Sequence, residues 1–255
     1  MFDISKYLGF PENASAHGAQ LDYWTGIIHL VMLFLLLIWV PFFTYVLIRF
    51  RASKNPKANY HGTKSHISTY LECAIIVVEV VLLAAFAIPI WAELREEHPV
   101  PKDVFVVHVV GEQFAWNIHY PGPDGVFGRR DIYLVDGATN PLGIDESDPN
   151  AKDDIISLNE LRIPVNKPVT IYLTSKDVIH CFSLPTMRVK QDIIPGLSIP
   201  VRFTPIKTGK YDLGCAQLCG LGHYRMHGWL IVETEEEFQE WLQEALQEKE
   251  EFAMN

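Results

Sequence analysis

The sequence predicts an N-terminal transmembrane α-helical hairpin followed by an all-β sandwich and a C-terminal helix. Three observations predict this fold class: two long apolar runs lie before residue 93, short alternating segments follow residue 99, and a capped amphipathic segment closes the sequence. With 255 residues, the chain is long enough for a membrane segment and one domain of ordinary size.

Residues 1–22 carry one lysine against three acids and precede the first apolar run. Residues 23–48 are that run, 26 uncharged residues between Asp22 and Arg49. At about 1.5 Å per residue, a helix of this length spans a hydrocarbon core of about 30 Å with room for tilt. This first run is too long for a signal peptide and lacks a basic flank, so we expect a transmembrane helix over 23–48. The second apolar run predicts another transmembrane helix over 71–92.

The loop over 49–70 predicts the orientation of these helices. It has five basic residues and no acid, namely Arg49, Arg51, Lys54, Lys57 and Lys64. Because cytoplasmic loops carry such an excess of Lys and Arg, we expect 49–70 in the cytoplasm and both 1–22 and everything after Trp91 outside. The exported part then lies in oxidising surroundings, where thiols form disulfides or bind metal.

Residues 93–233 are expected to form the exported sandwich. Strand-like segments separated by Pro, Gly and Asn are DVFVVHVVGE, QFAWNIHY, VTIYLTS, LSIPVRF, KYDLG and GWLIVE. Several short strands with turn signals favour a sandwich or barrel. The polar stretch 121–163, rich in Gly, Pro and Asp, is expected to be a long surface excursion.

The last segment, 234–255, is expected to be an acidic helix. Thr234 and Glu237 have the spacing of an S/T-x-x-E capping box. Apolar residues then recur at helical spacing and are expected to pack against the sandwich: Phe238, Trp241, Leu242, Ala245 and Leu246.

The stretch GCAQLCGLGHYRMHG, residues 214–228, brings together side chains that can bind metal. A disulfide between Cys215 and Cys219 is one interpretation, and a zinc site is a second, although methionine is a poor zinc ligand. Thiolate, imidazole and thioether together favour copper. Two thiolates can bridge two copper ions if each ion has its own nitrogen ligand. His223 offers one nitrogen, and His180, expected in a loop after VTIYLTS, offers the other.

The pattern C-x-x-x-C-x-x-x-H-x-x-M, preceded by D-V-x-H and D-x-I-P-G, resembles subunit II of the haem–copper cytochrome c oxidases. The resemblance covers nearly the whole chain and implies a cupredoxin-like sandwich with a binuclear copper centre, CuA. The implied ligands are Cys215 and Cys219 as bridging thiolates, His180 and His223 as terminal ligands, Met226 as a weak ligand and the backbone carbonyl of Gln217.

The resemblance also implies a role in respiration. Subunit II of an aa3-type cytochrome c oxidase accepts electrons from cytochrome c at CuA and passes them to haem a in subunit I, where oxygen is reduced. The chain would then be the electron-accepting part of a proton-translocating oxidoreductase. Implied partners are subunits I and III, a lipid bilayer, and cytochrome c or a tethered c-type cytochrome; no nucleic acid is expected. The expected location is a bacterial cytoplasmic (inner) membrane, with the copper domain on the periplasmic, outer face.

Several positions bear on roles beyond copper binding. Gln217 stands where the family has a glutamate that helps to hold a magnesium ion shared with subunit I, so we expect this magnesium site to be weak or absent. The family segment G-H-Q-W-x-W reads GEQFAW here, which places Phe114 and Trp116 where electrons enter from the donor. Trp116 as a core aromatic is the alternative. Asp177 matches an acidic position near the donor-docking patch.

Two carboxylates belong to the second membrane helix. Glu72 matches the family's glutamate at the mouth of a proton channel into subunit I, with an ordinary interface carboxylate as the alternative. Glu79 stands where the family tends to carry proline. A lone carboxylate at that depth should face protein or a water-filled path.

Other functions fit parts of the pattern. They are the CuA-bearing subunit of a nitric oxide reductase, a membrane-anchored copper carrier or assembly factor, and a quinol oxidase subunit, although the last lacks the copper ligands present here. The formal net charge is −10 while 49–70 is basic, so the exported face is acidic and would steer a basic cytochrome c. No C-x-x-C-H motif occurs, so no fused c-type haem domain is expected.

Overall fold

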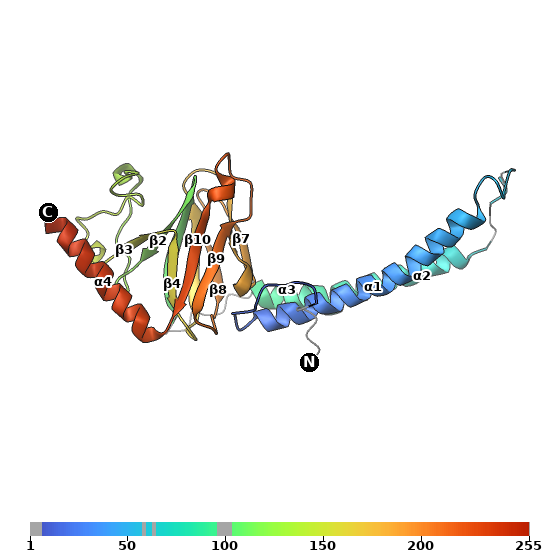
Figure 1. The fold of residues 1–255 in the computed structure, drawn as a ribbon, viewed down its shortest axis with the longest axis horizontal. Coiled ribbons are helices and arrows are strands. Elements are labelled where there is room, and N and C mark those ends of the chain that lie inside the picture. The colour runs from blue at the N-terminus through green and yellow to red at the C-terminus, as the bar shows by residue number, and fades with distance from the viewer. Residues whose placement is uncertain (1–6, 58–59, 63–64, 96–103, 255) are drawn as a thin grey trace. The chain divides into compact units, whose positions relative to one another are not determined.

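The computed structural model describes residues 7–57, 60–62, 65–95 and 104–254 (Figure 1). The described residues fall into two compact units, one with 7–29 and 104–254 and the other with 30–95. Lys64, one of the bases of the predicted cytoplasmic loop, lies outside the described residues.

The apolar segments are helical. Helix α1 spans Gly18–Arg49, α2 spans Ile67–Leu82, the π-helical turn η1 spans Leu83–Ala87 and α3 spans Ile88–Arg95. Gly18–Arg49 and Ile67–Ala87 are long and apolar enough to cross a membrane, by length and composition. The π turn ends two residues before Pro89, which has no N–H to donate and crowds the carbonyl four residues earlier, within that turn. The widened turn therefore accommodates the proline.

In the described part of the chain, ten strands form the sandwich. They are β1 Phe105–Glu112, β2 Ala115–Tyr120, β3 Ile155–Leu158, β4 Glu160–Pro164, β5 Val169–Ser175, β6 His180–Leu184, β7 Val189–Ile193, β8 Ile199–Phe203, β9 Gly209–Cys215 and β10 His227–Glu233. Two five-stranded sheets result, in the orders β3-β2-β1-β5-β8 and β4-β10-β9-β6-β7. With the apolar helices and a C-terminal helix, this confirms the predicted fold class, including a cupredoxin-like sandwich.

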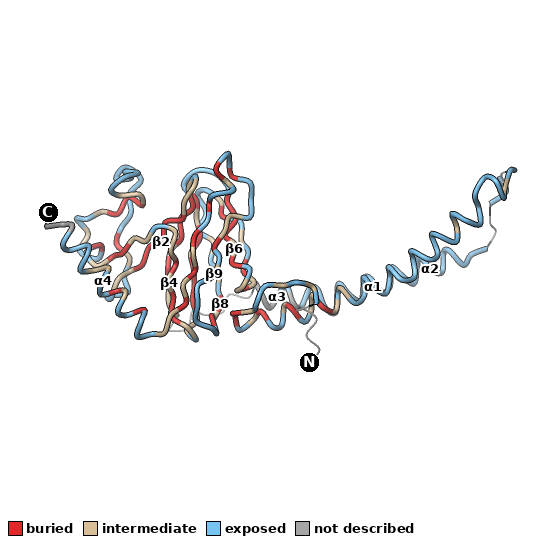
Figure 2. Tube along the Cα trace, in the orientation of Figure 1, coloured by how far each residue is buried: buried red, intermediate tan, exposed pale blue. Residues whose placement is uncertain are grey.

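The core lies between the two sheets, because alternate side chains of each strand point inward. Val107 and Val109 of β1 are buried, as are Leu230 and Val232 of β10. Figure 2 shows buried residues along the strands and exposed ones along the apolar helices. A helix that is apolar on all sides and not buried in protein is typical of a membrane span.

Helix α4, Glu235–Met254, ends the described chain. Glu237 N donates to Thr234 Oγ1 at 3.2 Å, and Thr234 N donates to Glu237 Oε2 at 2.9 Å, so the predicted capping box is confirmed. The predicted apolar stripe packs against the sandwich core, with Phe238 and Leu242 buried.

The stretch 121–163 is more structured than the sequence predicts. Its end forms β3 and most of β4, so the expectation of a surface excursion is wrong for 155–163. The remainder, 121–154, is called the excursion below. Its apolar side chains Leu142, Ile144 and Ala151 form a small second core with Val110 of β1. The many Asp residues of the excursion make it look wholly polar in the sequence, so this second core was not expected. The Asp side chains close local turns by accepting backbone N–H groups.

The segment before α1 packs on the sandwich. Ala14 is fully buried; its N–H donates to Thr186 O at 2.9 Å, and its carbonyl accepts from Ile206 N at 2.8 Å. Asp22, in the second turn of α1, accepts two hydrogen bonds from the Arg188 guanidinium, at 2.7 and 2.8 Å. In the sequence, Asp22 only marks where an apolar run begins. In the structure, its carboxylate anchors the start of α1 to the sandwich.

Candidate metal centre

Two neighbouring strands and one loop carry the candidate ligands. Cys215 is the last residue of β9, and His180 is the first residue of β6, which pairs with β9. The expectation that His180 lies in a loop is wrong, because its backbone pairs with Ile193 of β7. Cys219 and Met226 belong to the connection between β9 and β10. This connection with the end of β9, residues 215–226, is called the metal loop below.

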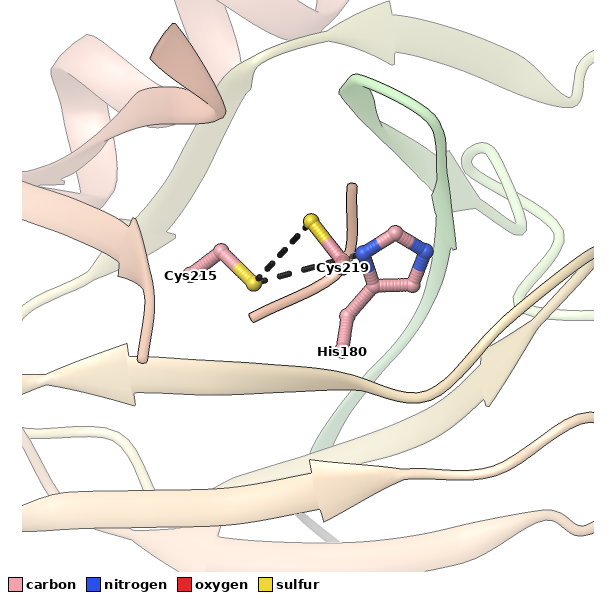
Figure 3. Close-up of side chains that lie close together, drawn as sticks. All are labelled: His180, Cys215 and Cys219. Carbon is pink, nitrogen blue, oxygen red and sulfur yellow. Dashed lines mark hydrogen bonds between the residues drawn. The ribbon is translucent and has the colours of Figure 1, made fainter. Parts of the chain in front are cut away.

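The two cysteine thiols face each other across the metal loop (Figure 3). Their sulfur atoms are 3.8 Å apart, and both thiols are free. A disulfide needs sulfur atoms about 2.05 Å apart, so the structure does not support the disulfide interpretation. Ligand atoms of His180, Cys215 and Cys219 all lie within 4.8 Å of one another, which makes them a possible metal site.

Each sulfur has its own imidazole and a further weak donor. Cys215 Sγ lies 4.0 Å from His180 Nδ1 and 3.1 Å from the carbonyl oxygen of Gln217. Cys219 Sγ lies 3.6 Å from His223 Nδ1 and 3.8 Å from Met226 Sδ. The structure therefore brings together all six of the copper ligands that the resemblance implies.

The donor set fits a soft transition metal. A thiolate–metal bond is about 2.3 Å long, so two sulfur atoms 3.8 Å apart can both bind the same ion. Two thiolates, two imidazoles and a thioether suit copper better than a hard cation that prefers oxygen. Because each sulfur has its own imidazole beside it, the donors are numerous enough to bind two ions.

Burial affects the protonation of these thiols. His180 is fully buried, and Cys219 and Met226 are nearly so. Burial, together with the neighbouring thiol of Cys215, raises the pKa of Cys219 to about 11. The metal-free thiol is therefore neutral at pH 7, and a metal ion has to displace its proton.

A carboxylate orients the imidazole of His180. Asp177 Oδ1 lies 2.8 Å from His180 Nε2, which leaves Nδ1 directed at Cys215. The other oxygen, Oδ2, accepts the backbone N–H of Gln113 at 2.7 Å. Burial alone would raise the pKa of Asp177, but hydrogen bonds from His180, Gln113 and Val178 outweigh it and lower the pKa. Carboxylates that hold a metal-binding histidine in this way tune its basicity and orientation.

The turn between β1 and β2 forms one wall of the site. Gln113 Nε2 donates to the carbonyl of Cys219 at 2.6 Å. The ring of Phe114 lies over the metal loop so closely that a Cβ added at Gly222 would come within 2.3 Å of it. Sequence reasoning missed Gln113 and Gly222; the G-L-G spacing between Cys219 and His223 is the signal that marks this close approach.

Trp116 lies behind the site and is fully buried. Its ring contacts His180 edge-on at a centroid distance of 6.3 Å and Phe182 at 5.7 Å. The predicted role of Phe114 and Trp116 in electron uptake stays a prediction, as does donor docking by Asp177. Glu72 belongs to the membrane unit, so its predicted role at a proton channel also stays a prediction.

Comparison with known proteins identifies the family. The sequence model of "Cytochrome C oxidase subunit II, periplasmic domain" matches residues 105–234. The chain is 33% identical over 206 residues to "Alternative cytochrome c oxidase subunit 2" of Bradyrhizobium diazoefficiens, covering 80% of this chain and 73% of that protein. It is 26% identical over 251 residues to "Cytochrome c oxidase subunit 2" of Cereibacter sphaeroides, covering 93% of this chain and 80% of that protein.

Among solved structures, the periplasmic domain of subunit II of cytochrome oxidase from Bradyrhizobium japonicum is 32% identical, with a TM-score of 0.43. The match covers 59% of this chain and 99% of that one. Two findings assign the family. The family model matches about half of the chain, and the similarity to the Bradyrhizobium diazoefficiens protein extends over 80% of the chain. The chain therefore belongs to the cytochrome c oxidase subunit II family.

Proposed function

We propose that this chain is the electron-accepting subunit of an aa3-type cytochrome c oxidase and holds a binuclear copper centre. One observation carries the proposal: two free thiols lie 3.8 Å apart, and each has its own imidazole Nδ1 within 4.0 Å. A single tetrahedral ion takes four donors, whereas six lie together here, because the carbonyl of Gln217 and the thioether of Met226 accompany the two thiols and two imidazoles.

In this proposal Cys215, Cys219, His180 and His223 would hold two copper ions. Met226 and the carbonyl of Gln217 would supply the weaker ligands. When bound, two coppers that share two thiolates spread one electron over both metals, so that bond lengths change little on oxidation and reduction.

The surrounding residues hold the ligands and exclude water. Asp177 keeps Nδ1 of His180 directed at the metal side, and Trp116 closes the space behind that imidazole. Gln113 fixes the carbonyl of Cys219, and Phe114 covers the glycines of the metal loop. Such an outer layer restricts ligand movement and tunes the potential of the bound metal.

The finer assignments follow the same proposal. Subunits I and III are the partners, haem a in subunit I is the acceptor, and the donor is cytochrome c or a tethered c-type cytochrome. Residues 49–70 face the cytoplasm of a bacterium, whereas 1–22 and the sandwich over 93–233 lie on the outer face of the inner membrane, with 234–255 as their last helix. Helices over 23–48 and 71–92 cross the bilayer.

Two further roles depend on residues outside the copper ligands. The side chain of Gln217 is exposed and uncharged, so a magnesium ion shared with subunit I should be weakly held or missing. Glu72 is proposed to lie at the mouth of a proton channel, and Glu79 to face protein or water within the complex.

Two alternatives make different demands on the site. A copper carrier needs ligands that exchange metal readily, but His180 and Cys219 are buried here. The CuA subunit of a nitric oxide reductase would need the same ligands, so only the reaction separates it from an oxidase. The purified complex, supplied with reduced c-type cytochrome, should consume oxygen. Consumption of nitric oxide in place of oxygen would contradict the proposal.

A further inference from the structure

A pocket lies on the outer face of the sheet β3-β2-β1-β5-β8, away from the core. The residues on either side of His108 in β1 are buried in the core, so the His108 side chain points to the opposite face. Tyr172 of β5 lies beside His108 in register, and Thr174 follows on the same face. These three residues line a cavity of about 250 Å³, whose other walls are Arg130 of the excursion and residues 196–198 between β7 and β8.

Arg130 brings an unpaired positive charge to this pocket. In the described part of the chain, no hydrogen bond or ion pair holds its guanidinium, whereas the guanidinium of Arg129 is paired with Asp145. Arg130 is exposed overall, yet partial burial lowers the pKa of its guanidinium, and the charge of Asp154 acts in the opposite direction. An arginine side chain stays charged at neutral pH. A cation that is partly desolvated and unpaired is stabilised by an anion beside it.

None of the described carboxylates lines the pocket, although acidic residues outnumber basic ones in the chain. Asp154, whose charge acts on Arg130, is engaged elsewhere: its Oδ2 lies 2.8 Å from His119 Nε2 and accepts the N–H of Gly128 at 2.9 Å. Burial, together with the charges of Arg130 and His119, lowers the pKa of His108 to about 4, so His108 is neutral at pH 7. The pocket lining therefore carries one positive charge and no negative one.

The neutral side chains around Arg130 include several hydrogen-bond donors. Tyr172, Thr174 and Ser198 each bring a hydroxyl to the lining, and none of these hydroxyls is bonded to another of the described residues. Together with the forked guanidinium, they offer more donors than a carboxylate has oxygens, which favours a phosphate group. At about 250 Å³, the cavity is smaller than the pockets of about 300–1,000 Å³ that bind drug-sized ligands, so it suits a small anion.

We propose that this pocket binds a phosphate group, with the Arg130 guanidinium as its charged contact and the hydroxyls of Tyr172, Thr174 and Ser198 as neutral donors. The group is either free inorganic phosphate or the phosphate of a lipid headgroup, since both present the same oxygens. The site uses none of the copper ligands, so the proposal does not rest on the proposed function.

The pocket is formed by three segments that are distant in sequence. Arg130 belongs to the excursion, Thr174 to β5, and Ser198 to the connection between β7 and β8. That connection follows Ile193, the residue that pairs with His180. A bound phosphate would therefore tie the excursion to a segment that begins beside the candidate metal centre.

The test measures how fast phenylglyoxal, which reacts with accessible guanidinium groups, labels Arg130 in the purified, lipid-depleted membrane complex. Mass spectrometry reads the label at each arginine. Inorganic phosphate at about ten times its Kd should slow the labelling of Arg130 about tenfold, because the bound anion covers the guanidinium. Arg129 is the internal control: its side chain is 68% exposed and does not line the pocket, so phosphate should leave its labelling unchanged.

A variant and a second probe sharpen the test. Ser198→Ala keeps the cation but removes one donor, so the phosphate concentration that gives half-protection should rise about tenfold. Dihexanoyl phosphatidylglycerol, added without inorganic phosphate, distinguishes the sources: protection by this lipid identifies a headgroup, whereas protection by inorganic phosphate alone identifies the free ion.

Three results would overturn the phosphate proposal. One is labelling of Arg130 that neither inorganic phosphate nor the lipid slows. Another is equal protection by acetate at the same ionic strength, because the pocket would then have no preference for a phosphate group. The third is a half-protection concentration that Ser198→Ala leaves unchanged, because Arg130 alone would then attract the anion.

Discussion

The metal loop and residues Ile132–Val135, which we call the tip of the excursion, both expose large apolar side chains, but they are built in opposite ways. In the metal loop, Leu218, Leu221 and Tyr224 are exposed while Cys219 and Met226 point inward and are buried. In the tip, all four side chains of Ile132–Val135 point outward. Exposure in the metal loop accompanies a ligand set that faces the core. Exposure in the tip has no such inward counterpart.

The difference also concerns what holds each loop. The metal loop is held from outside itself, by Gln113 and Phe114 from the turn between β1 and β2. The tip is held by hydrogen bonds of its own loop, from Asp131, Asp136 and Asn140. Changes in the metal loop or its wall should therefore alter the metal centre, whereas changes at the tip should leave the centre intact.

The largest expected effect comes from removing a thiol. Cys219→Ser should abolish the binuclear centre and lower donor-driven oxygen consumption by more than about 100-fold, because losing a ligand exceeds the 10–100-fold cost of disturbing the layer around it. Copper content and turnover of the purified complex measure this. The matched control is Cys73→Ser on α2, where the cysteine is exposed and remote in sequence from the ligands. Equal copper content in both variants would contradict the ligand assignment.

A smaller effect should follow from filling the space beneath Phe114. In Gly222→Ala the new Cβ would lie 2.3 Å from the Phe114 ring, so the metal loop has to shift. Overpacking of this kind costs about 1–3 kcal/mol, and we expect copper loss to a chelator to accelerate about tenfold. Gly214→Ala is the matched control, because a Cβ there meets nothing within 4 Å. Adding Phe114→Ala to Gly222→Ala should restore part of the copper retention. If the double variant instead loses copper as fast as the two single effects combined, the contact between the new Cβ and Phe114 is not the cause.

Removing the charge that orients His180 should lower copper affinity about 10–100-fold. Asp177→Asn keeps the size of the side chain but replaces an accepting oxygen next to His180 Nε2 with an amide. Competition with a chelator measures the affinity. The control is Asp212→Asn, whose carboxylate lies 3.1 Å from the exposed imidazole of His227. If both variants bind copper as the unaltered protein does, Asp177 is no positioning residue.

The mildest perturbation is a change of pH. The pKa of Cys219 is raised from 9.0 to about 11, so the metal-free folded protein binds more protons than the unfolded chain between these values. Its stability should be fully present below about pH 9 and decrease as the pH rises towards 11. Denaturant unfolding of the metal-free protein across this range measures the decrease. Cys219→Ser should lose less stability over the same range, and an identical pH profile would show that this thiol is not responsible.

Some parts of this structure follow directly from local sequence patterns. The six segments with strand signals became β1, β2, β5, β8, β9 and β10. The capping box at Thr234 formed as predicted, since it depends on residues three apart. The spacing from Cys215 to Met226 places four side-chain ligands in one loop for the same reason.

Other parts depend on contacts between distant residues, which spacing does not reveal. β3 and β4 are hidden in a polar stretch because pairing with β2 and β10, not an apolar pattern, makes them strands. The pairing of β6 with β7 puts His180 in a strand. Asp177 matched an acidic family position near the docking patch, but its carboxylate faces His180 as well as the β1–β2 turn. The bond between Asp22 and Arg188 joins residues 166 apart in sequence.

The central claim is that two thiols, each paired with its own imidazole, hold two copper ions that share one electron. Electron paramagnetic resonance of the purified complex, combined with copper analysis, tests it most directly. The account predicts a seven-line copper signal from a mixed-valence pair and two coppers per chain, both lost in Cys219→Ser. A four-line signal from one copper per chain, or zinc in place of copper, would contradict it.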